Sequence, residues 1–302
     1  MKRHILITGA TGMVGKSLIK ALQQEGHKIS ILSRKPATIK NVTVYLWDIA
    51  KQTIDEKCFE GVDTVVHLAG ENVAGKKWTK EHKQQIIDSR VQSAALLYNT
   101  LKRISHQVAQ FISASAIGYY GDSGDEILTE QSDKGFGFLA ECCGLWEHEA
   151  DHFKTLGLKV VKVRIGFVLG KHEGALVSLE KPIRFFVGAP LGSGKQWIPW
   201  IHLDDLVRIF VFAIENPLMM GAYNACAPYP VTNATLTKTL AKQLNRPVWP
   251  INVPEKVLEF ILGEMSSVVT MSTNTSAQKI LAAGFSFKYT RLEDALSNLY
   301  QK

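Results

Sequence analysis

The stretch Ile5-Leu-Ile-Thr-Gly-Ala-Thr-Gly-Met-Val-Gly15 lies at the start of a chain of 302 residues and determines its fold. A continuous apolar run such as 5–7 is typical of a buried parallel strand. The apolar residues Val14, Leu18 and Leu22 then recur at helical spacing. The chain therefore turns sharply from a strand into a helix through Gly-x-x-Gly-x-x-Gly, a sequence typical of a dinucleotide site.

Each glycine of this turn has its own role. Gly9 permits the tight bend, Gly12 lets backbone N–H groups approach a pyrophosphate, and Gly15 lets the helix pack closely on the strand. The start of a helix also favours negative charge. We predict that a dinucleotide binds here; the alternative is a glycine-rich connection at which nothing binds. The residues assigned to the turn are Gly9, Thr11, Gly12, Met13, Val14 and Gly15.

The composition is that of an ordinary globular protein. Hydrophobic residues make up 46% of the chain and charged residues 21%, which allows a large core. No apolar run approaches the roughly 18 residues that a membrane span needs, and residues 1–4 leave no room for a signal peptide. The four cysteines lack the spacing of a disulfide framework or a metal site. We therefore expect a cytoplasmic protein with no metal and no membrane partner.

The net charge of +7 does not indicate a nucleic-acid-binding protein. Lysines and arginines are spread along the chain rather than gathered in blocks. Attraction to the anionic phosphates of a cofactor is the simpler explanation, so we expect no nucleic-acid partner.

Further β-rich apolar runs alternate with helix-like stretches. The runs lie at 28–33, 42–46, 62–68, 108–113 and 160–165, and the later ones are separated by helical stretches at 79–103 and 139–156. Alternation of this kind implies right-handed crossovers. It predicts an α/β fold with a Rossmann-like, doubly wound parallel sheet.

The remaining sequence predicts a smaller, discontinuous C-terminal substrate lobe. Residues 171–199 are rich in Gly, Pro and aromatic residues, and residues 229–302 carry several prolines before a helical stretch. No long polar linker precedes either segment. We therefore assign 1–170, with 200–228 returning to it, to the dinucleotide-binding domain, and 171–199 and 229–302 to the substrate lobe.

The end of the second strand predicts the type of cofactor. NAD sites place an acidic residue there to bind the ribose, whereas a 2′-phosphate requires a cation. This strand ends in Leu32-Ser-Arg-Lys-Pro36, with no carboxylate at Ser33 and with Arg34 next to Lys35. We therefore predict that NADP(H) is preferred over NAD(H), the alternative being an exposed basic loop. Asp48, after the third strand, is expected to contact the adenine amino group or to lie in a solvated turn.

Further motifs resemble those of the extended short-chain dehydrogenase superfamily, also called the NAD-dependent epimerase/dehydratase superfamily. His67-Leu-Ala-Gly70 is similar to its fourth-strand motif, and Phe111-Ile-Ser-Ala-Ser115 is similar to the fifth strand that carries its active-site serine. Trp200-Ile-His-Leu-Asp-Asp205 resembles the motif that opens a later helix. The residues that the resemblance implies at the cofactor are Leu68, Ala69, Gly70 and Ser113.

Longer motifs narrow the resemblance to one subgroup of atypical members. These motifs include Ser115-Ala-Ile-Gly-Tyr-Tyr-Gly-Asp122 and Gly192-Ser-Gly-Lys-Gln-Trp197. The subgroup comprises epimerase-family proteins with a C-terminal domain of unknown function, sometimes labelled nucleoside-diphosphate-sugar epimerase or cell-division inhibitor. The resemblance covers essentially the whole chain. It implies a homodimer formed through the helices at 79–103 and 139–156.

The chain departs from the superfamily at the catalytic pair. In Tyr-x-x-x-Lys, the lysine lowers the pKa of the tyrosine, which passes a proton while nicotinamide exchanges hydride. The corresponding helix here reads Phe136-Gly-Phe-Leu-Ala-Glu-Cys-Cys-Gly-Leu-Trp146 and contains neither residue. The spacing is occupied either by Phe138 and Cys142 or by Leu139 and Cys143.

Ser115 and Tyr119 are therefore the candidate catalytic residues. Ser115 is expected to hydrogen-bond a substrate carbonyl, and Tyr119, or its neighbour Tyr120, to donate a proton if a cation lowers its pKa. Packing inside the fold is the other interpretation of the tyrosines. Arg164, at the end of the sixth strand, is expected to face the nicotinamide or to be a satisfied strand-end charge.

The insertion Gly188-Ala-Pro-Leu-Gly-Ser-Gly-Lys-Gln-Trp197 is predicted to be a mobile lip over the substrate cleft, with a structural loop as the alternative. Lys195 is expected to meet an anionic group, and Trp197 or Trp200 to stack on a ring. The sequence thus predicts an NADP(H)-dependent oxidoreductase or epimerase-like enzyme with a small, unidentified substrate. The alternative is a nucleotide-binding sensor that keeps the cofactor and lacks catalysis.

Overall fold

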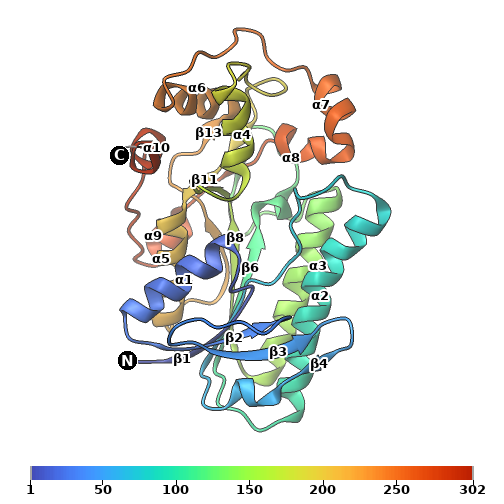
Figure 1. Cartoon of the computed structure of the whole chain (residues 1–302), viewed down its shortest axis with the longest axis vertical. Helices are drawn as coiled ribbons and strands as arrows, with labels where there is room; N and C mark the ends of the chain where they lie inside the picture. The colour runs from blue at the N-terminus through green and yellow to red at the C-terminus, as the bar shows by residue number, and fades with distance from the viewer. Residues whose placement is uncertain (1, 301–302) are drawn as a thin grey trace.

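A computed structural model describes residues 2–300 of the chain (Figure 1). Its main sheet has eight strands in the order β12-β8-β6-β5-β1-β2-β3-β4. These strands are β1 (His4–Thr8), β2 (Lys28–Ser33), β3 (Thr43–Asp48), β4 (Thr53–Ile54), β5 (Thr64–His67), β6 (Gln110–Ala116), β8 (Lys159–Ile165) and β12 (Gly221–Ala225). All neighbours are parallel except β3 and β4. The predicted α/β fold with a Rossmann-like parallel sheet is confirmed.

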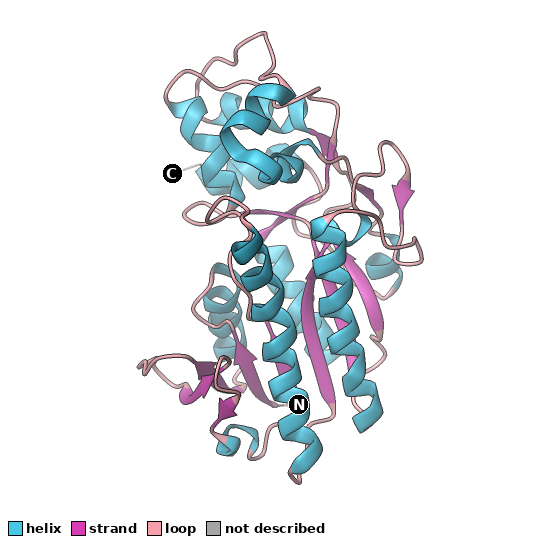
Figure 2. Cartoon of the chain, turned by 90° about the vertical axis from the view of Figure 1, so that its right-hand side faces the viewer, coloured by secondary structure: helices cyan, strands magenta, loops and turns pink. Residues whose placement is uncertain are grey.

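Helices cover both faces of this sheet. On one face α1 (Met13–Gln24) packs beside α5 (Leu203–Glu215), and on the other α2 (Lys80–Arg103) packs beside α3 (Phe138–His152). Figure 2 shows α2 and α3 running side by side in front of the strands. Strands β1 and β5 are buried along their whole length because helices cover both of their faces.

Side-chain alternation along β1 divides the core into two layers. Ile5 and Ile7 pack with the apolar side of α1, including Leu18, whereas Leu6 packs with Leu97 of α2 on the opposite face. This alternation is the period of two that a strand imposes on its side chains. The continuous apolar run therefore packs against helices on both faces of the sheet.

The remaining elements lie mostly beyond the carboxyl ends of the strands (Figure 1). The helices are α4 (Ala175–Arg184), α6 (Asn233–Gln243), α7 (Glu255–Leu262), α8 (Ser267–Thr270), α9 (Gln278–Ala282) and α10 (Leu292–Tyr300). The short strands are β7 (Ile127–Leu128), β9 (Phe167–Leu169), β10 (Trp197–Ile198), β11 (Trp200–His202), β13 (Val231–Thr232) and β14 (Asn274–Thr275). The 3₁₀ helices are η1 (Glu56–Phe59), η2 (Ile117–Tyr120), η3 (Phe153–Leu156) and η4 (Gly263–Ser266).

Asp205, at the start of α5, fastens the C-terminal segment to the sheet domain. Its fully buried carboxylate accepts hydrogen bonds from the backbone N–H groups of Lys288 and Tyr289, both at 2.8 Å, and from Arg208 at 2.7 Å. Paired in this way, the buried charge holds two distant parts of the chain together.

Within residues 2–300, no helix has both the length and the hydropathy to cross a membrane.

Candidate dinucleotide site

The glycine-rich turn between β1 and α1 lies at the point where the strand order reverses. β1 pairs with β2 on one side and with β5 on the other, and ligands of such sheets bind at the carboxyl ends of these strands. A Cβ atom on Gly9, whose φ is +67°, would lie 2.5 Å from the carbonyl oxygen of Leu68. A Cβ atom on Gly15 would lie 2.5 Å from the carbonyl oxygen of Gly9. Both glycines are therefore required by close backbone packing.

Gly12 differs from these two glycines because the protein leaves space in front of it. A Cβ atom there would meet only the carbonyl oxygen of Gly9, at 3.4 Å. Gly12 is also the N-cap of α1, provides no capping side chain, and is followed by a first turn without an acidic residue. The first N–H groups of α1 and the positive end of its dipole are thus available to an anion.

The fourth-strand motif is held beside this turn by a buried histidine. The His67 Nδ1 atom lies 2.8 Å from the Thr8 hydroxyl, which accepts hydrogen bonds from the N–H groups of Leu68 and Ala69 at 3.2 and 3.1 Å. Complete burial lowers the pKa of His67 to about 3, so its ring is neutral. This arrangement fixes the segment 68–70 against Gly9.

The end of β2 is basic and exposed. Arg34 and Lys35 are both exposed, and neither forms an ion pair within residues 2–300. The Ser33 hydroxyl donates a hydrogen bond to the carbonyl of Lys35 at 2.6 Å and shapes the turn. Asp48 accepts a hydrogen bond from the N–H of Lys51 and is half-exposed, which agrees with the solvated-turn interpretation of this residue.

A buried ion pair joins the ends of β6 and β8 to α3. Arg164 donates to both carboxylate oxygens of Glu147, at 2.7 and 2.9 Å, and the Ser115 hydroxyl donates to the same carboxylate at 2.8 Å. Burial alone would lower the pKa of Arg164, but the Glu147 carboxylate raises it above its ordinary value. Arg164 is thus the satisfied strand-end charge of the two alternatives. Ser115 is 2% exposed and would have to leave Glu147 to donate to a substrate.

Two neighbouring tyrosines of η2 contact the Arg164 guanidinium. Tyr120 accepts a hydrogen bond from Arg164 at 2.8 Å and donates one to Asn224 at 2.7 Å, and burial raises its pKa to about 12. The Tyr119 ring lies 3.6 Å from the guanidinium carbon, and this side chain is only half-buried. Of the two phenols, Tyr119 is therefore the one that a ligand can reach.

The helix α3 shows which residues stand in place of the usual catalytic pair. A Cβ atom on Gly118 of η2 would lie 3.2 Å from Leu139 Cβ and 3.8 Å from Cys143 Sγ. Leu139 and Cys143, four residues apart, therefore face η2. Burial raises the pKa of the Cys143 thiol to about 12, so this thiol stays protonated at neutral pH and is no base.

Two of the residues assigned to the sites lie deeper than expected. Trp200 is fully buried and donates its indole N–H to the carbonyl of Tyr229, so the prediction that it stacks on a substrate is wrong. The side chain of Ser113 is 1% exposed and donates to the carbonyl of Ala114. In both cases neighbouring segments of the fold cover the side chain.

The insertion 188–197 is tied to its surroundings at several points. The buried side chain of Gln196 donates to the carbonyls of Leu191 and Val269, both at 2.9 Å. The half-buried Trp197 donates its indole N–H to Asp125 at 2.7 Å, whereas Lys195 is exposed. These bonds agree with the structural-loop interpretation of the insertion.

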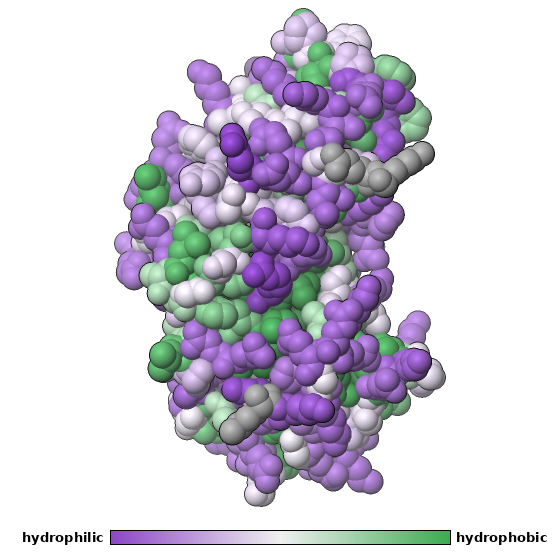
Figure 3. Space-filling view, turned by 90° about the vertical axis from the view of Figure 1, so that its left-hand side faces the viewer, coloured by the Kyte–Doolittle hydropathy of each residue, from purple (hydrophilic) through white to green (hydrophobic). Residues whose placement is uncertain are grey.

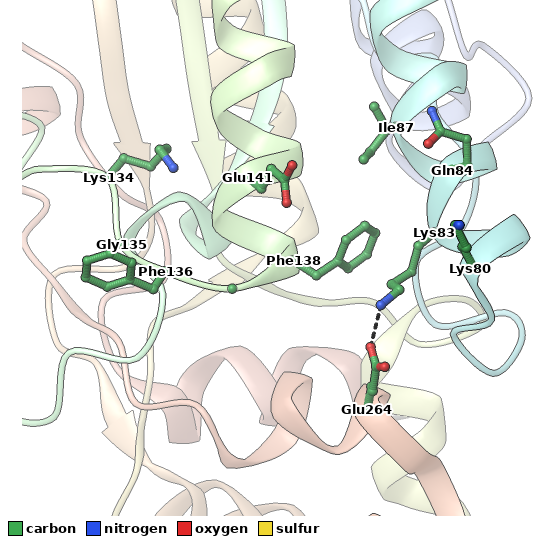
Figure 4. Close-up of a pocket in the computed structure, with 11 residues that line it drawn as sticks. Lys80, Lys83, Gln84, Ile87, Lys134, Gly135, Phe136, Phe138, Glu141 and Glu264 are labelled. Carbon is green, nitrogen blue, oxygen red and sulfur yellow. Dashed lines mark hydrogen bonds and ion pairs between the residues drawn. The ribbon is translucent and has the colours of Figure 1, made fainter.

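A pocket of about 690 Å³ lies outside the dinucleotide site, between α2, the start of α3 and η4 (Figure 4). Residues that line it include Lys80, Lys83, Lys134, Phe136, Phe138 and Glu264. Lys83 and Glu264 form an ion pair of 2.6 Å across its edge. None of the residues predicted to bind cofactor or substrate lines this pocket, so we assign it no part in the dinucleotide site.

One group of possible metal ligands occurs in residues 2–300, and its histidine has the wrong tautomer for an ion. Glu25, His27 and Glu215 bring ligand atoms within 4.8 Å of one another. The Nδ1 atom of His27 accepts the backbone N–H of Arg3 at 3.1 Å, so in the neutral ring the proton is on Nε2. The nitrogen nearest the carboxylates is thus a donor to them and not a metal ligand.

The sheet, its switch point and the open glycine turn define a Rossmann-type dinucleotide-binding fold. The family model described as "NAD dependent epimerase/dehydratase family" matches residues 5–226, and the chain belongs to this family. A further family model, a domain of unknown function (DUF1731), matches residues 253–299. The predicted superfamily and the predicted C-terminal domain of unknown function are both confirmed.

The similarity to known proteins extends over essentially the whole chain. An epimerase family protein of Staphylococcus aureus strain MRSA252 is 36% identical over 100% of both chains, and YfhF of Bacillus subtilis is 35% identical over 98% of this chain and 97% of its own. The crystal structure of human epimerase family protein SDR39U1 with NADPH has a TM-score of 0.87 and 28% identity over 99% of both chains. The UDP-glucuronic acid 4-epimerase of Bacillus cereus, with UDP-glucuronic acid and NAD, has a TM-score of 0.80 at 18% identity over 98% of both chains, a likeness of fold alone.

Proposed function

We propose that this protein is an NADP(H)-dependent oxidoreductase or epimerase-like enzyme that acts on a small molecule. The observation that carries this function is the pair Arg34 and Lys35 at the end of β2, where an NAD site would have a carboxylate. Both cations are exposed and unpaired within residues 2–300, so a 2′-phosphate meets no competing partner. The human relative crystallised with NADPH supports the same cofactor.

A fluorescence titration with NADPH and with NADH tests this cofactor preference. The wild type is expected to bind NADPH more tightly, and Arg34→Ala to weaken NADPH alone by roughly tenfold to a hundredfold, the value of a hydrogen-bonded charge pair. Lys102→Ala, which removes an exposed lysine from the far end of α2, is the control and leaves both affinities unchanged. An equal loss of both nucleotides in Arg34→Ala would contradict the assignment.

Within the active site we propose Tyr119 as the proton donor. Bound nicotinamide supplies hydride chemistry, and a proton must then reach the substrate oxygen from a side chain. Tyr119 is half-buried, and its hydroxyl has no hydrogen bond within residues 2–300. The Arg164 guanidinium, held by the Glu147 carboxylate to which Ser115 also donates, lies against its ring and fixes its position. Ser115 is thus a positioning residue for Tyr119.

Consumption of NADPH with a panel of aldehydes, ketones and quinones tests the catalytic part. Tyr119→Phe is expected to remove turnover and to keep NADPH affinity, because the phenol does not contribute to the dinucleotide site. Tyr229→Phe, which alters an exposed tyrosine outside the network, is the control. Turnover that survives in Tyr119→Phe would overturn the assignment of the proton donor.

A sensor that binds NADPH without turnover is the second candidate function. The observation that favours it is the occupation of the catalytic helix positions by Leu139 and by Cys143 with a raised pKa, because neither side chain can exchange a proton at neutral pH. Tight NADPH binding together with no turnover on any member of the panel would support the sensor and contradict the enzyme.

A further inference from the structure

Two loop segments beyond α4 and α6 expose large apolar side chains. Phe185, Phe186 and Val187 follow α4, whereas Trp249 and Ile251 lie between α6 and α7. All five are more than half exposed, with Phe185 at 78% and Ile251 at 73%. We call these five residues the apical patch because they lie on loops at the end of the molecule away from the N-terminus (Figure 1). Gathered apolar side chains of this kind mark a contact surface.

The two segments form one surface rather than two separate loops. The backbone N–H of Trp249 donates to the carbonyl of Gly188 at 2.9 Å, and its indole N–H donates to the carbonyl of Phe186 at 2.7 Å. The Arg246 guanidinium lies 4.6 Å from the centroid of the Phe186 ring. Phe186 has a φ of +63°, a left-handed conformation that side-chain-bearing residues rarely adopt. The patch is therefore held in an exposed arrangement by the fold.

The two chain segments that carry the apical patch contain basic residues and no acidic ones. The segments 181–188 and 242–251 contain four basic residues and no Asp or Glu. The basic residues are Lys181, Arg184, Lys242 and Arg246. Only Arg184 has a carboxylate partner within residues 2–300, the nearly buried Glu180. A cluster of aromatic and aliphatic side chains bordered by cations matches the interface of a membrane that contains anionic lipids.

We propose that the apical patch binds the surface of an anionic lipid bilayer. Phe185, Val187 and Ile251 enter the boundary between headgroups and acyl chains, Trp249 lies at the headgroup level, and the surrounding cations meet lipid phosphates. Charge complementarity favours a bilayer over a protein partner, because the two segments contain four basic residues and no acidic ones, which matches a uniformly anionic surface. The prediction of no membrane partner rests on the absence of an apolar run long enough to span a bilayer, and binding at the surface requires no such run.

The other exposed apolar residues provide a matched control surface. Leu218 and Met220, after α5, are 85% and 57% exposed. They lie on the segment between α5 and β12. On the side of the molecule drawn in Figure 3, apolar residues gather near the middle. The segment 216–221 contains no charged residue, and Lys159 beside it donates to the carbonyl of Pro217 at 3.0 Å. A double substitution here removes two large apolar side chains of similar exposure to Phe185 and Ile251.

Co-sedimentation of the full chain with vesicles tests the proposal. The vesicles are phosphatidylcholine alone, or phosphatidylcholine with about one third phosphatidylglycerol. The wild type is expected to bind only the second kind, with a blue shift of its tryptophan fluorescence, and to dissociate at high salt. Phe185→Ser with Ile251→Ser is expected to lower the bound-to-free ratio by about tenfold or more. Leu218→Ser with Met220→Ser keeps wild-type binding. The substituted side chains are exposed, so each variant retains the core.

Three results would overturn the proposal. They are absence of wild-type binding to the anionic vesicles, equal binding by the Phe185/Ile251 variant and the wild type, and binding that does not depend on the anionic lipid. Sedimentation velocity of the same proteins without lipid tests whether a second copy of the chain covers the apical patch instead. A wild-type dimer that the Phe185/Ile251 variant cannot form would show that a second copy, and not a bilayer, covers the apical patch.

Discussion

Replacing Glu147 by alanine leaves the Arg164 guanidinium buried without its carboxylate. The side chains of Glu147 and Arg164 are 6% and 4% exposed, and two hydrogen bonds of 2.7 and 2.9 Å join them. Removal of one partner of a buried pair costs about 3–5 kcal/mol, because the other charge stays desolvated. The hydrogen bond from Arg164 to Tyr120 survives and compensates only part of this loss. We expect Glu147→Ala to lower the free energy of unfolding by about 3–5 kcal/mol.

Urea denaturation followed by circular dichroism measures this loss. Glu56→Ala is the control, because the Glu56–Arg103 ion pair is about half exposed and its removal is expected to cost less than about 1 kcal/mol. Glu147→Met combined with Arg164→Met removes both buried charges and is expected to recover most of the stability. A loss of unfolding free energy below about 1 kcal/mol in Glu147→Ala, similar to that of the control, would refute the claim that Arg164 needs Glu147 to compensate its buried charge.

Three further predictions concern His67, the hydrogen bonds of Asp205 to the C-terminal segment, and Gly15. Burial lowers the pKa of His67 from 6.5 to about 3, so its contribution to the free energy of unfolding is complete above pH 6.5 and is lost as the pH falls. The free energy of unfolding is expected to decrease by about 2 kcal/mol by pH 5, and His67→Gln is expected to remove this dependence on pH. Asp205→Ala is expected to lower the free energy of unfolding by about 2–3 kcal/mol and to increase protease cleavage near Lys288. Unchanged cleavage would contradict the role of Asp205 in holding the C-terminal segment. Gly15→Ala places a Cβ 2.5 Å from a backbone oxygen, so its melting temperature should fall well below that of wild type.

The strands and helices of the sheet domain could be predicted because their periodic patterns are long. The strand predicted at 28–33 is found at Lys28–Ser33, and the helix predicted at 79–103 is found at Lys80–Arg103. The helix predicted at 139–156 ends at His152, and 153–156 forms a separate 3₁₀ turn. Apolar periodicity continues through both segments, so the change in backbone geometry between them leaves no signal in the sequence.

The buried network at α3 was missed, although the sequence contains a signal for it. Glu147 follows Cys143 by four residues and so lies on the same face of the helix. In the strand, Lys162 and Arg164 are two residues apart within an apolar run, which places two cations on one face of a buried sheet. Buried cations need acidic partners, so the pairing of Arg164 with Glu147 could have been anticipated.

The accessibility of single residues could not be predicted in the same way. Trp200 is covered by residues of α6 and α10, which come from distant parts of the sequence. Whether an aromatic residue in such a motif stacks on a ligand or fills a core depends on that packing. Local spacing contains no information about it.

The most direct test of the dinucleotide site is the binding of NADPH to the wild type and to Gly12→Ala. A Cβ at Gly12 has room in the protein but occupies the space in front of the turn. We expect Gly12→Ala to melt at the wild-type temperature and to lose NADPH affinity, whereas the wild type binds NADPH. Equal NADPH binding by both proteins, or no binding by the wild type, would contradict the claim that this turn is a dinucleotide site.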